Sequence, residues 1–182
     1  MENSKEDSGV IETKERNLIS KNLQVDSEIW VLLVHSYLKS IFENTQKDKN
    51  VKNLALENLA SDLGRNIVEK CVDDRLSRYK TRLDIIKFIG VDVWTFLFGK
   101  AVTKIDSRDE VRETYYFHDN DFKFFRRIST ESETGKEYVQ FCMTFISYLL
   151  RSALLAFSIE SDINIESTNY TEYTFIISIK PA

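Results

Sequence analysis

Glycine and proline are scarce throughout this chain, and that scarcity limits the folds open to it. The 182 residues include five glycines and one proline, roughly a quarter of the usual share of these two residue types. A many-stranded sandwich needs turn residues about every ten positions, and collagen-like or proline-rich chains need far more of both. The sequence therefore predicts long helices with few breaks.

Size, charge and cysteine content describe one mildly acidic domain. A chain of this length buries roughly 70% of its unfolded surface, so its core needs neither a disulfide nor a metal. The formal net charge is −4, which disfavours nucleic acid as a partner because phosphate binding requires a basic surface. Cys71 and Cys142 lie in apolar helical patterns, and we expect both to be buried free thiols.

The N-terminal residues differ in composition from the rest of the chain. Residues 1–25 are mostly polar and charged, so they bury too little apolar surface to offset the entropy of ordering. We expect residues 1–25 to form a disordered tail and residues 26–182 to form a single domain. The tail also lacks the apolar core of a signal peptide, which favours a cytoplasmic protein.

Apolar residues recur at three- and four-residue steps over four segments, each of which predicts a helix. Thr81 and Asp84 have capping-box spacing at the start of the third. Gly64 inside the second costs about 1 kcal/mol relative to alanine and indicates a close backbone approach. Trp94 lies in the third, where apolar residues cover most of the circumference and predict burial. The four segments are residues 26–42, 53–73, 82–98 and 136–157.

Strand-like alternation occurs in two pairs of segments. Residues 113–118 and 122–128 are rich in aromatic side chains and flank the polar turn at 119–121, which predicts a hairpin. Residues 159–166 and 173–179 predict a second hairpin. The fold class that follows is α+β, with four or five helices packed on a small antiparallel sheet of about four strands.

The segment 139–159 has two interpretations. Its 21 residues contain one charged side chain, Arg151, and its length suits a membrane span. A central arginine would cost roughly 2.5–3.5 kcal/mol in a membrane. We favour a central core helix in which Arg151 has a structural role and either pairs with a carboxylate or reaches solvent.

Catalytic and metal-binding patterns are weak. His35 and Cys71 are a conceivable base and nucleophile, but no third group orients them. The histidines and cysteines occur singly, and the glycines are isolated, which disfavours a metal site and a phosphate-binding loop. We therefore expect no catalytic residue, no metal and no cofactor. A basic cluster suits either an anionic membrane surface or a solvated loop balanced by nearby aspartates; it contains Arg75, Arg78, Lys80 and Arg82 around Tyr79.

The first two helices carry more large apolar side chains than a four-stranded sheet can cover. Apolar patches rich in Trp and Tyr mark protein–protein interfaces. We therefore predict a partner-binding site on these helices. Its residues are Trp30, Leu33, Val34, Tyr37 and Leu38 on the first helix, with Leu56, Leu59 and Leu63 on the second.

Several blocks of sequence, in fixed order, carry a family resemblance. They are Leu63-Gly64-Arg65, the run at 82–89, Asp92-Val93-Trp94, Phe98-Gly99-Lys100, the run at 115–122, and Leu149-Leu150-Arg151-Ser152-Ala153-Leu154. The ordered set resembles the small α+β subunits of the transport protein particle (TRAPP), most closely the six-type branch. In the last block Ser152 stands where that family has glycine.

The resemblance implies a non-enzymatic subunit that forms a heterodimer with another small subunit through its first two helices. Such pairs assemble into a larger tethering complex, peripheral at Golgi and endoplasmic-reticulum membranes, that promotes nucleotide exchange on a Rab GTPase. The founding subunit carries an acylated cysteine in the loop after its glycine-bearing helix. Residues 74–80 contain no cysteine and Cys71 comes too early, so the resemblance implies no acyl modification here.

Two other functions remain open from the residues alone. The helices bearing Trp94, Phe96 and Phe145 could enclose an apolar cavity for an acyl chain or a flat cofactor. A hydrolase using Cys71 is the third possibility, although no substrate is suggested.

Overall fold

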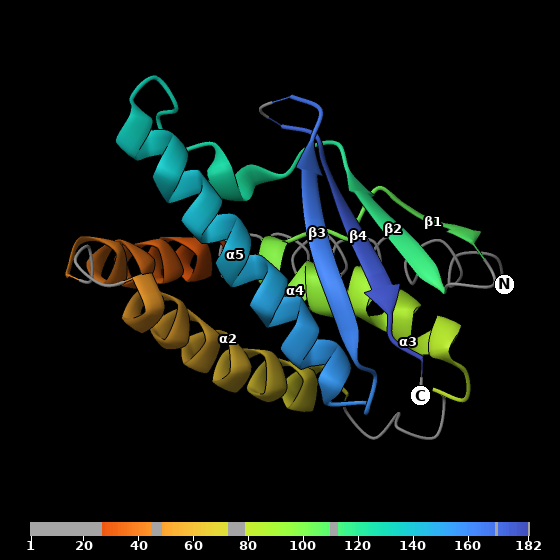
Figure 1. Ribbon diagram of the computed structural model, residues 1–182. Coiled ribbons are helices and arrows are strands. Elements are labelled where there is room, and N and C mark those ends of the chain that lie inside the picture. The colour runs from red at the N-terminus through yellow and green to blue at the C-terminus, as the bar shows by residue number, and fades with distance from the viewer. Residues whose placement is uncertain (1–26, 45–48, 73–78, 110–112, 170, 182) are drawn as a thin grey trace, which may run out of the picture.

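The structure is a computed structural model that describes residues 27–44, 49–72, 79–109, 113–169 and 171–181. Its elements are drawn in Figure 1. Residues 27–44 are helical, and we call them the 27–44 helix. The other elements are α2 (Lys49–Val72), α3 (Arg82–Phe88), the π-helical turn η2 (Ile89–Val93), α4 (Trp94–Phe98), β1 (Lys104–Asp109), β2 (Thr114–Asp119), the 3₁₀ turn η3 (Lys123–Phe125), α5 (Glu133–Leu155), β3 (Ser161–Ser167) and β4 (Tyr173–Ile179).

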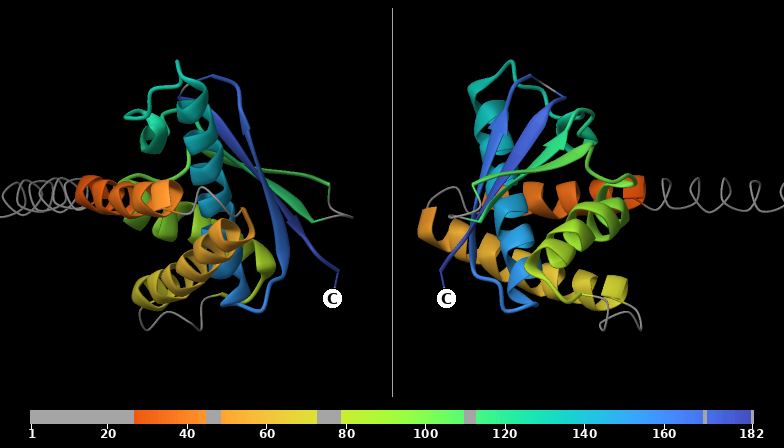
Figure 2. Two further views of the ribbon diagram at one scale, coloured as in Figure 1. Left: turned by 60° about the vertical axis from the view of Figure 1, so that its left-hand side comes forward. Right: turned by 90° about the vertical axis from the view of Figure 1, so that its right-hand side faces the viewer.

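The four strands form one antiparallel sheet in the order β1-β2-β4-β3. Alternate residues of β2 and β4 are buried, which gives the sheet one core-facing side. Phe117 and Phe175 pair across these strands and both are completely buried. The helices lie on this one side of the sheet (Figure 2). The α+β class with two hairpins is confirmed.

The first hairpin has a different partner from the one predicted. β2 pairs with β1, whereas residues 122–128 contain the turn η3. Phe124 and Phe125 are both buried, but consecutive residues of a strand point to opposite faces, so the aromatic run 122–128 does not suit a half-buried strand. β1 went unrecognised because its sequence KIDSRD has a single apolar residue and shows no alternation.

The central helix α5 begins three residues before the predicted start, with Ser132 as its N-cap. Within the described residues it is the one helix long and apolar enough to cross a membrane. It lies between α2 and the sheet (Figure 1) and contacts α2 and β3. Nine of its residues are buried, among them Phe145 and Leu149. That packing is the arrangement of a core helix.

The third predicted helix is divided into α3, η2 and α4. The capping box forms as expected, since Thr81 Oγ1 accepts from the Asp84 amide at 3.1 Å and Asp84 Oδ2 accepts from the Thr81 amide at 3.0 Å. These hydrogen bonds, with the Thr81 hydroxyl first, lower the pKa of Asp84. The helix stops at Gly99, whose φ of 77° suits glycine.

Two sequence predictions fall outside the described residues. The tail at residues 1–25 is one of them. The other concerns Arg75 and Arg78 of the basic cluster.

Candidate partner-binding surface

One side of the 27–44 helix exposes a stripe of large apolar side chains. Ile29 is 52% exposed, Leu33 64% and Tyr37 58%. Their four-residue spacing places them on one side of the helix. Val34 and Leu38, on another side, are buried in the core. The helix therefore has a core-facing side and a separate apolar side that the chain's own described residues leave exposed.

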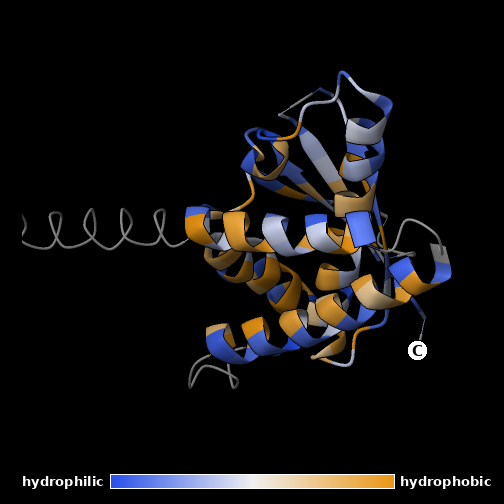
Figure 3. Ribbon diagram, turned by 90° about the vertical axis from the view of Figure 1, so that its left-hand side faces the viewer, coloured by the Kyte–Doolittle hydropathy of each residue, from blue (hydrophilic) through white to orange (hydrophobic). Residues whose placement is uncertain are grey.

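The start of α2 adds to this surface. Val51 is 52% exposed and Leu54 is 59% exposed. Leu59 and Leu63 are partly buried and pack against the core. Figure 3 views the molecule from the side on which the 27–44 helix and α2 lie, and both ribbons carry hydrophobic residues along their length. We call the five exposed side chains the partner stripe: Ile29, Leu33, Tyr37, Val51 and Leu54.

The structure separates the eight predicted partner-binding residues into three groups. Leu33 and Tyr37 are exposed and belong to the partner stripe. Trp30, Leu59 and Leu63 are partly buried and line the core edge. The remaining three are buried in the chain's own core, where Val34 is 6% exposed and Leu38 and Leu56 are 0% exposed.

The prediction that these three residues bind a partner is therefore corrected, because a side chain with little or no accessible surface has almost none to bury against a partner. Sequence reasoning left Ile29, Val51 and Leu54 out of the site. The four-residue step from Ile29 to Leu33 was the signal that could have found the first of them.

Gly64 allows α2 and α5 to cross closely. A Cβ atom at Gly64 would lie 2.7 Å from the Leu149 carbonyl oxygen and 2.8 Å from Ser152 Cβ. Ser152 Oγ donates to the Ser61 carbonyl at 2.8 Å, which ties the two helices together at the same level. The predicted close backbone approach is present, and its neighbour is α5.

Trp94 is anchored by a buried carboxylate. Trp94 is completely buried, and its indole N–H donates to Asp119 Oδ2 at 3.0 Å. Asp119 also accepts from Lys100 Nζ and, at 3.0 Å, from the Asp121 amide. The sequence suggested only a turn at Asp119. The structure makes Asp119 the group that fixes the end of β2 to α4.

Arg151 reaches solvent, which is one of the two environments expected for it. Its side chain is exposed on α5, so the helix carries no uncompensated buried charge at this position.

The candidate catalytic pair has no catalytic geometry. His35 Nε2 donates to the Phe124 carbonyl at 2.8 Å, and the Tyr138 hydroxyl donates to the His35 carbonyl at 3.0 Å. Burial, followed by the Asp92 charge, raises the pKa of Cys71 to about 11, so at neutral pH this thiol is protonated and a poor nucleophile. Burial also raises the pKa of Cys142, to about 12. Among the described residues no cluster of three His, Cys, Asp or Glu side chains suits a metal ion.

The aromatic trio considered for a ligand cavity lines none of the pockets found among the described residues. Trp94 and Phe145 are buried, whereas Phe96 is 40% exposed. A pocket of about 600 Å³ instead lies between α2 and the end of α5, lined in part by Val68 and Leu155.

Comparison with known proteins gives a consistent result. The family described as Transport protein particle (TRAPP) component matches residues 30–180. Trafficking protein particle complex subunit 6B of Homo sapiens is 26% identical over 162 residues, covering 85% of this chain and 98% of that protein. The Danio rerio subunit 6b is 31% identical over 114 residues, covering 61% and 68%.

The fold has a counterpart among solved structures. It is similar to the crystal structure of a trafficking protein particle complex subunit 3 from Naegleria fowleri covalently bound to palmitic acid. The TM-score is 0.69 at 12% sequence identity, over 87% of this chain and 97% of that one. Since the TRAPP match spans nearly the whole described chain, and the small-subunit relatives align over most of their length, this chain belongs to the TRAPP component family.

Proposed function

We propose that this chain is a non-catalytic structural subunit of a TRAPP-type vesicle-tethering complex that heterodimerises with another small subunit of the same fold. The observation that carries the proposal is the partner stripe, with Leu33 and Tyr37 as its most exposed members on the 27–44 helix. Monomeric proteins rarely expose large apolar patches to water. Covering the partner stripe with a second subunit removes that surface from solvent.

The dimensions of the two helices suit such an interface. The 27–44 helix spans about 27 Å at 1.5 Å per residue, and two helices side by side are about 20 Å wide. The face they present is of the same order as the roughly 800 Å² per partner that a stable interface buries. Tyr37, which is 58% exposed on this face, is a residue type enriched in binding hot spots.

The heterodimer is the unit through which the chain enters the larger assembly. In this proposal the subunit acts in the cytoplasm, peripheral at Golgi and endoplasmic-reticulum membranes, and supports nucleotide exchange on a Rab GTPase by positioning its neighbours. Membership of the TRAPP component family supports this role. The protonated Cys71 and the hydrogen-bonded His35 fit a subunit without chemistry of its own.

The pocket between α2 and α5 supports a second candidate, a small-molecule binding module. Its volume of about 600 Å³ lies within the range of ligand sites, and the structurally similar Naegleria fowleri subunit 3 is covalently bound to palmitic acid. Cys71 is not among the residues that line this pocket, and burial raises the pKa of its thiol to about 11, so the candidate ligand is a non-covalent one. Native mass spectrometry of the purified protein tests this, because a retained ligand appears as added mass.

Co-expression tests the principal proposal. The tagged chain is produced together with each of the other small TRAPP subunits encoded by the same organism, and complexes are sized by light scattering. We expect a 1:1 complex with one of them. The assembled complex is then tested for nucleotide release from Rab GTPases, with and without this chain. Failure to pair with every small subunit contradicts the proposal, as does an unchanged assembly and exchange rate when the chain is omitted.

A further inference from the structure

A second binding feature lies on a different side of the 27–44 helix. Two pockets, of about 540 Å³ and about 380 Å³, follow one side of this helix and share Arg127 as a wall. The larger is bounded by the start of α5 and the smaller by residues 98–100 and 123–127. We call the two together the basic groove. None of its lining residues belongs to the partner stripe.

The groove is cationic although the chain as a whole is acidic. Five cationic side chains line it, whereas the net charge of the whole chain is −4. Three of them are paired with carboxylates, Lys39 with Glu43, Lys100 with Asp119 and Arg126 with Asp121, so the positive charge available to a ligand is that of Lys123 and Arg127. Lys123 and Arg127 are exposed, and within the described residues no ion pair joins either of them to a carboxylate.

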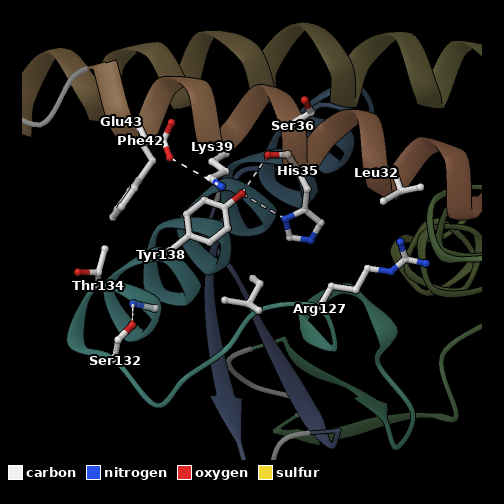
Figure 4. A pocket seen from close by; sticks show the side chains of 12 residues that line it. Leu32, His35, Ser36, Lys39, Phe42, Glu43, Arg127, Ser132, Thr134 and Tyr138 are labelled. Carbon is white, nitrogen blue, oxygen red and sulfur yellow. Dashed lines mark hydrogen bonds and ion pairs between the residues drawn. The ribbon is translucent and has the colours of Figure 1, made fainter.

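The larger pocket of the groove has apolar walls, and two of its lining side chains are held by hydrogen bonds. Leu32, Phe42 and Tyr138 line the larger pocket, and Leu32 is 45% exposed. Figure 4 shows Tyr138 pointing up from α5 toward His35, with Arg127 reaching toward the helix beside Leu32. The hydrogen bonds of Tyr138 and His35 to backbone carbonyls at 3.0 and 2.8 Å hold these walls in place.

The positive charge of Arg127 acts on the neighbouring imidazole of His35. Burial lowers the pKa of His35, and the positive charge of Arg127 lowers it further, against the hydrogen bond to Phe124. The neighbouring imidazole therefore contributes no second positive charge that would need its own partner at neutral pH. Positive charge at the groove's centre comes from the arginine.

We propose that the basic groove binds an acidic segment of a partner protein, with acidic side chains near Arg127 and Lys123 and one apolar side chain in the pocket beside Leu32 and Tyr138. Charge complementarity selects the acidic residues, and the apolar pocket selects the anchor. The groove follows the helix from Ser27 to Glu43, about 24 Å, which accommodates roughly seven extended residues.

A peptide fits these observations better than a membrane surface. Lys123 lines the smaller pocket and Arg127 lines both, and the larger pocket also has apolar walls that include Leu32 and Tyr138. A flat anionic bilayer contacts protruding cations and leaves a recess of this kind empty.

The experiment selects binders from a displayed library of random eight-residue peptides on the full-length protein. The comparison protein is the double variant Lys123→Glu/Arg127→Glu. The control is Lys70→Glu/Lys87→Glu, which makes the same change in net charge at exposed lysines on α2 and α3, outside the groove. Circular dichroism melts establish that all three proteins are folded.

We expect the wild type and the control to enrich peptides with two or more acidic residues next to an apolar one. A selected peptide should bind the groove variant at least tenfold more weakly by fluorescence anisotropy, and raising the salt concentration should weaken wild-type binding more than variant binding. Replacement of its apolar residue by serine should weaken binding to the wild type.

Three results would overturn the inference. The first is a selection without acidic enrichment. The second is equal binding of the selected peptide to the wild type and the groove variant. The third is the selection of no acidic peptide, together with a wild type that floats with phosphatidylserine vesicles and a groove variant that does not. That result would assign the cations to membrane binding. Each variant is also tested for complex formation with the small-subunit partner, which the groove variant should retain.

Discussion

Tyr37→Asp should weaken the heterodimer strongly and leave the isolated chain almost as stable as before. Tyr37 is 58% exposed, and a tyrosine presents roughly 200 Å² of surface. A partner that covers the exposed part removes about 120 Å² from water, which is about 3 kcal/mol at roughly 25 cal/mol per Å². Incomplete covering reduces this, so we expect a loss of about 2–3 kcal/mol, or an increase in Kd of about 30- to 150-fold.

The adjacent residue supplies the matched control. Leu38 is 0% exposed, so Leu38→Ala should destabilise the fold by about 2–5 kcal/mol, whereas Tyr37→Asp should change the free energy of unfolding by at most about 0.5 kcal/mol. Isothermal titration calorimetry with the partner subunit measures Kd, and circular dichroism melts of the isolated chain measure stability. An unchanged Kd, or a Tyr37→Asp protein as destabilised as Leu38→Ala, would refute the assignment of the two sides of this helix.

Three further predictions concern the framework that holds this surface. Gly64→Ala should lower the free energy of unfolding, measured by urea denaturation, by about 1–2 kcal/mol. The new Cβ would lie 2.7 Å from the Leu149 carbonyl oxygen, and this crowding outweighs the gain of about 1 kcal/mol in helix propensity. A stabilised variant would contradict the close crossing of α2 and α5. Asp119→Asn should cost about 1–3 kcal/mol and shift the tryptophan fluorescence, because Trp94 and Lys100 lose their carboxylate; an unaltered spectrum and urea midpoint would argue against the anchor. Burial lowers the folded-state pKa of His35 below its usual value of 6.5. The stability that the neutral imidazole contributes is therefore complete above pH 6.5 and is lost as the pH falls toward the folded-state pKa. His35→Gln should flatten this part of the curve of stability against pH, and an equally steep curve in the variant would count against a buried neutral imidazole.

Local signals predicted the parts of the fold that depend on local physics. β4 was predicted at its observed bounds of 173–179, because its alternation places every second side chain in the core. The capping box at Thr81 was predicted because its two hydrogen bonds depend on a spacing of three residues. The close approach at Gly64 followed from the cost of glycine in a helix, although the sequence did not show that α5 was the neighbour.

The parts that were missed depend on long-range packing. β1 is polar, and its strand conformation comes from the ladder with β2 rather than from its own residues. The aromatic run at 122–128 resembles a strand locally, yet Phe122 and Phe124 pack around Trp94 and Phe98. Asp119 reads as a turn residue because its donors, Trp94 and Lys100, lie 25 and 19 residues away in the sequence.

The partner stripe shows a further limit of periodicity. Leu33 and Val34 are both large and apolar, and neighbouring helical residues point about 100° apart. Periodicity therefore identified a wide apolar arc but not which part of it faces the core. The structure resolves this, since Val34 is 6% exposed and Leu33 is 64% exposed.

The 27–44 helix has three sides with different chemistry, and this makes its proposed roles separable. Val34 and Leu38 attach it to the core, Leu33 and Tyr37 face outward, and Leu32 lies about 100° from Leu33 on the side of the basic groove. A substitution on one side changes the surface offered to one ligand and leaves the other contacts in place. Two ligands can then bind the same helix without competing for side chains, so a subunit of this size can join one neighbour through an apolar stripe and still accept an acidic segment from another.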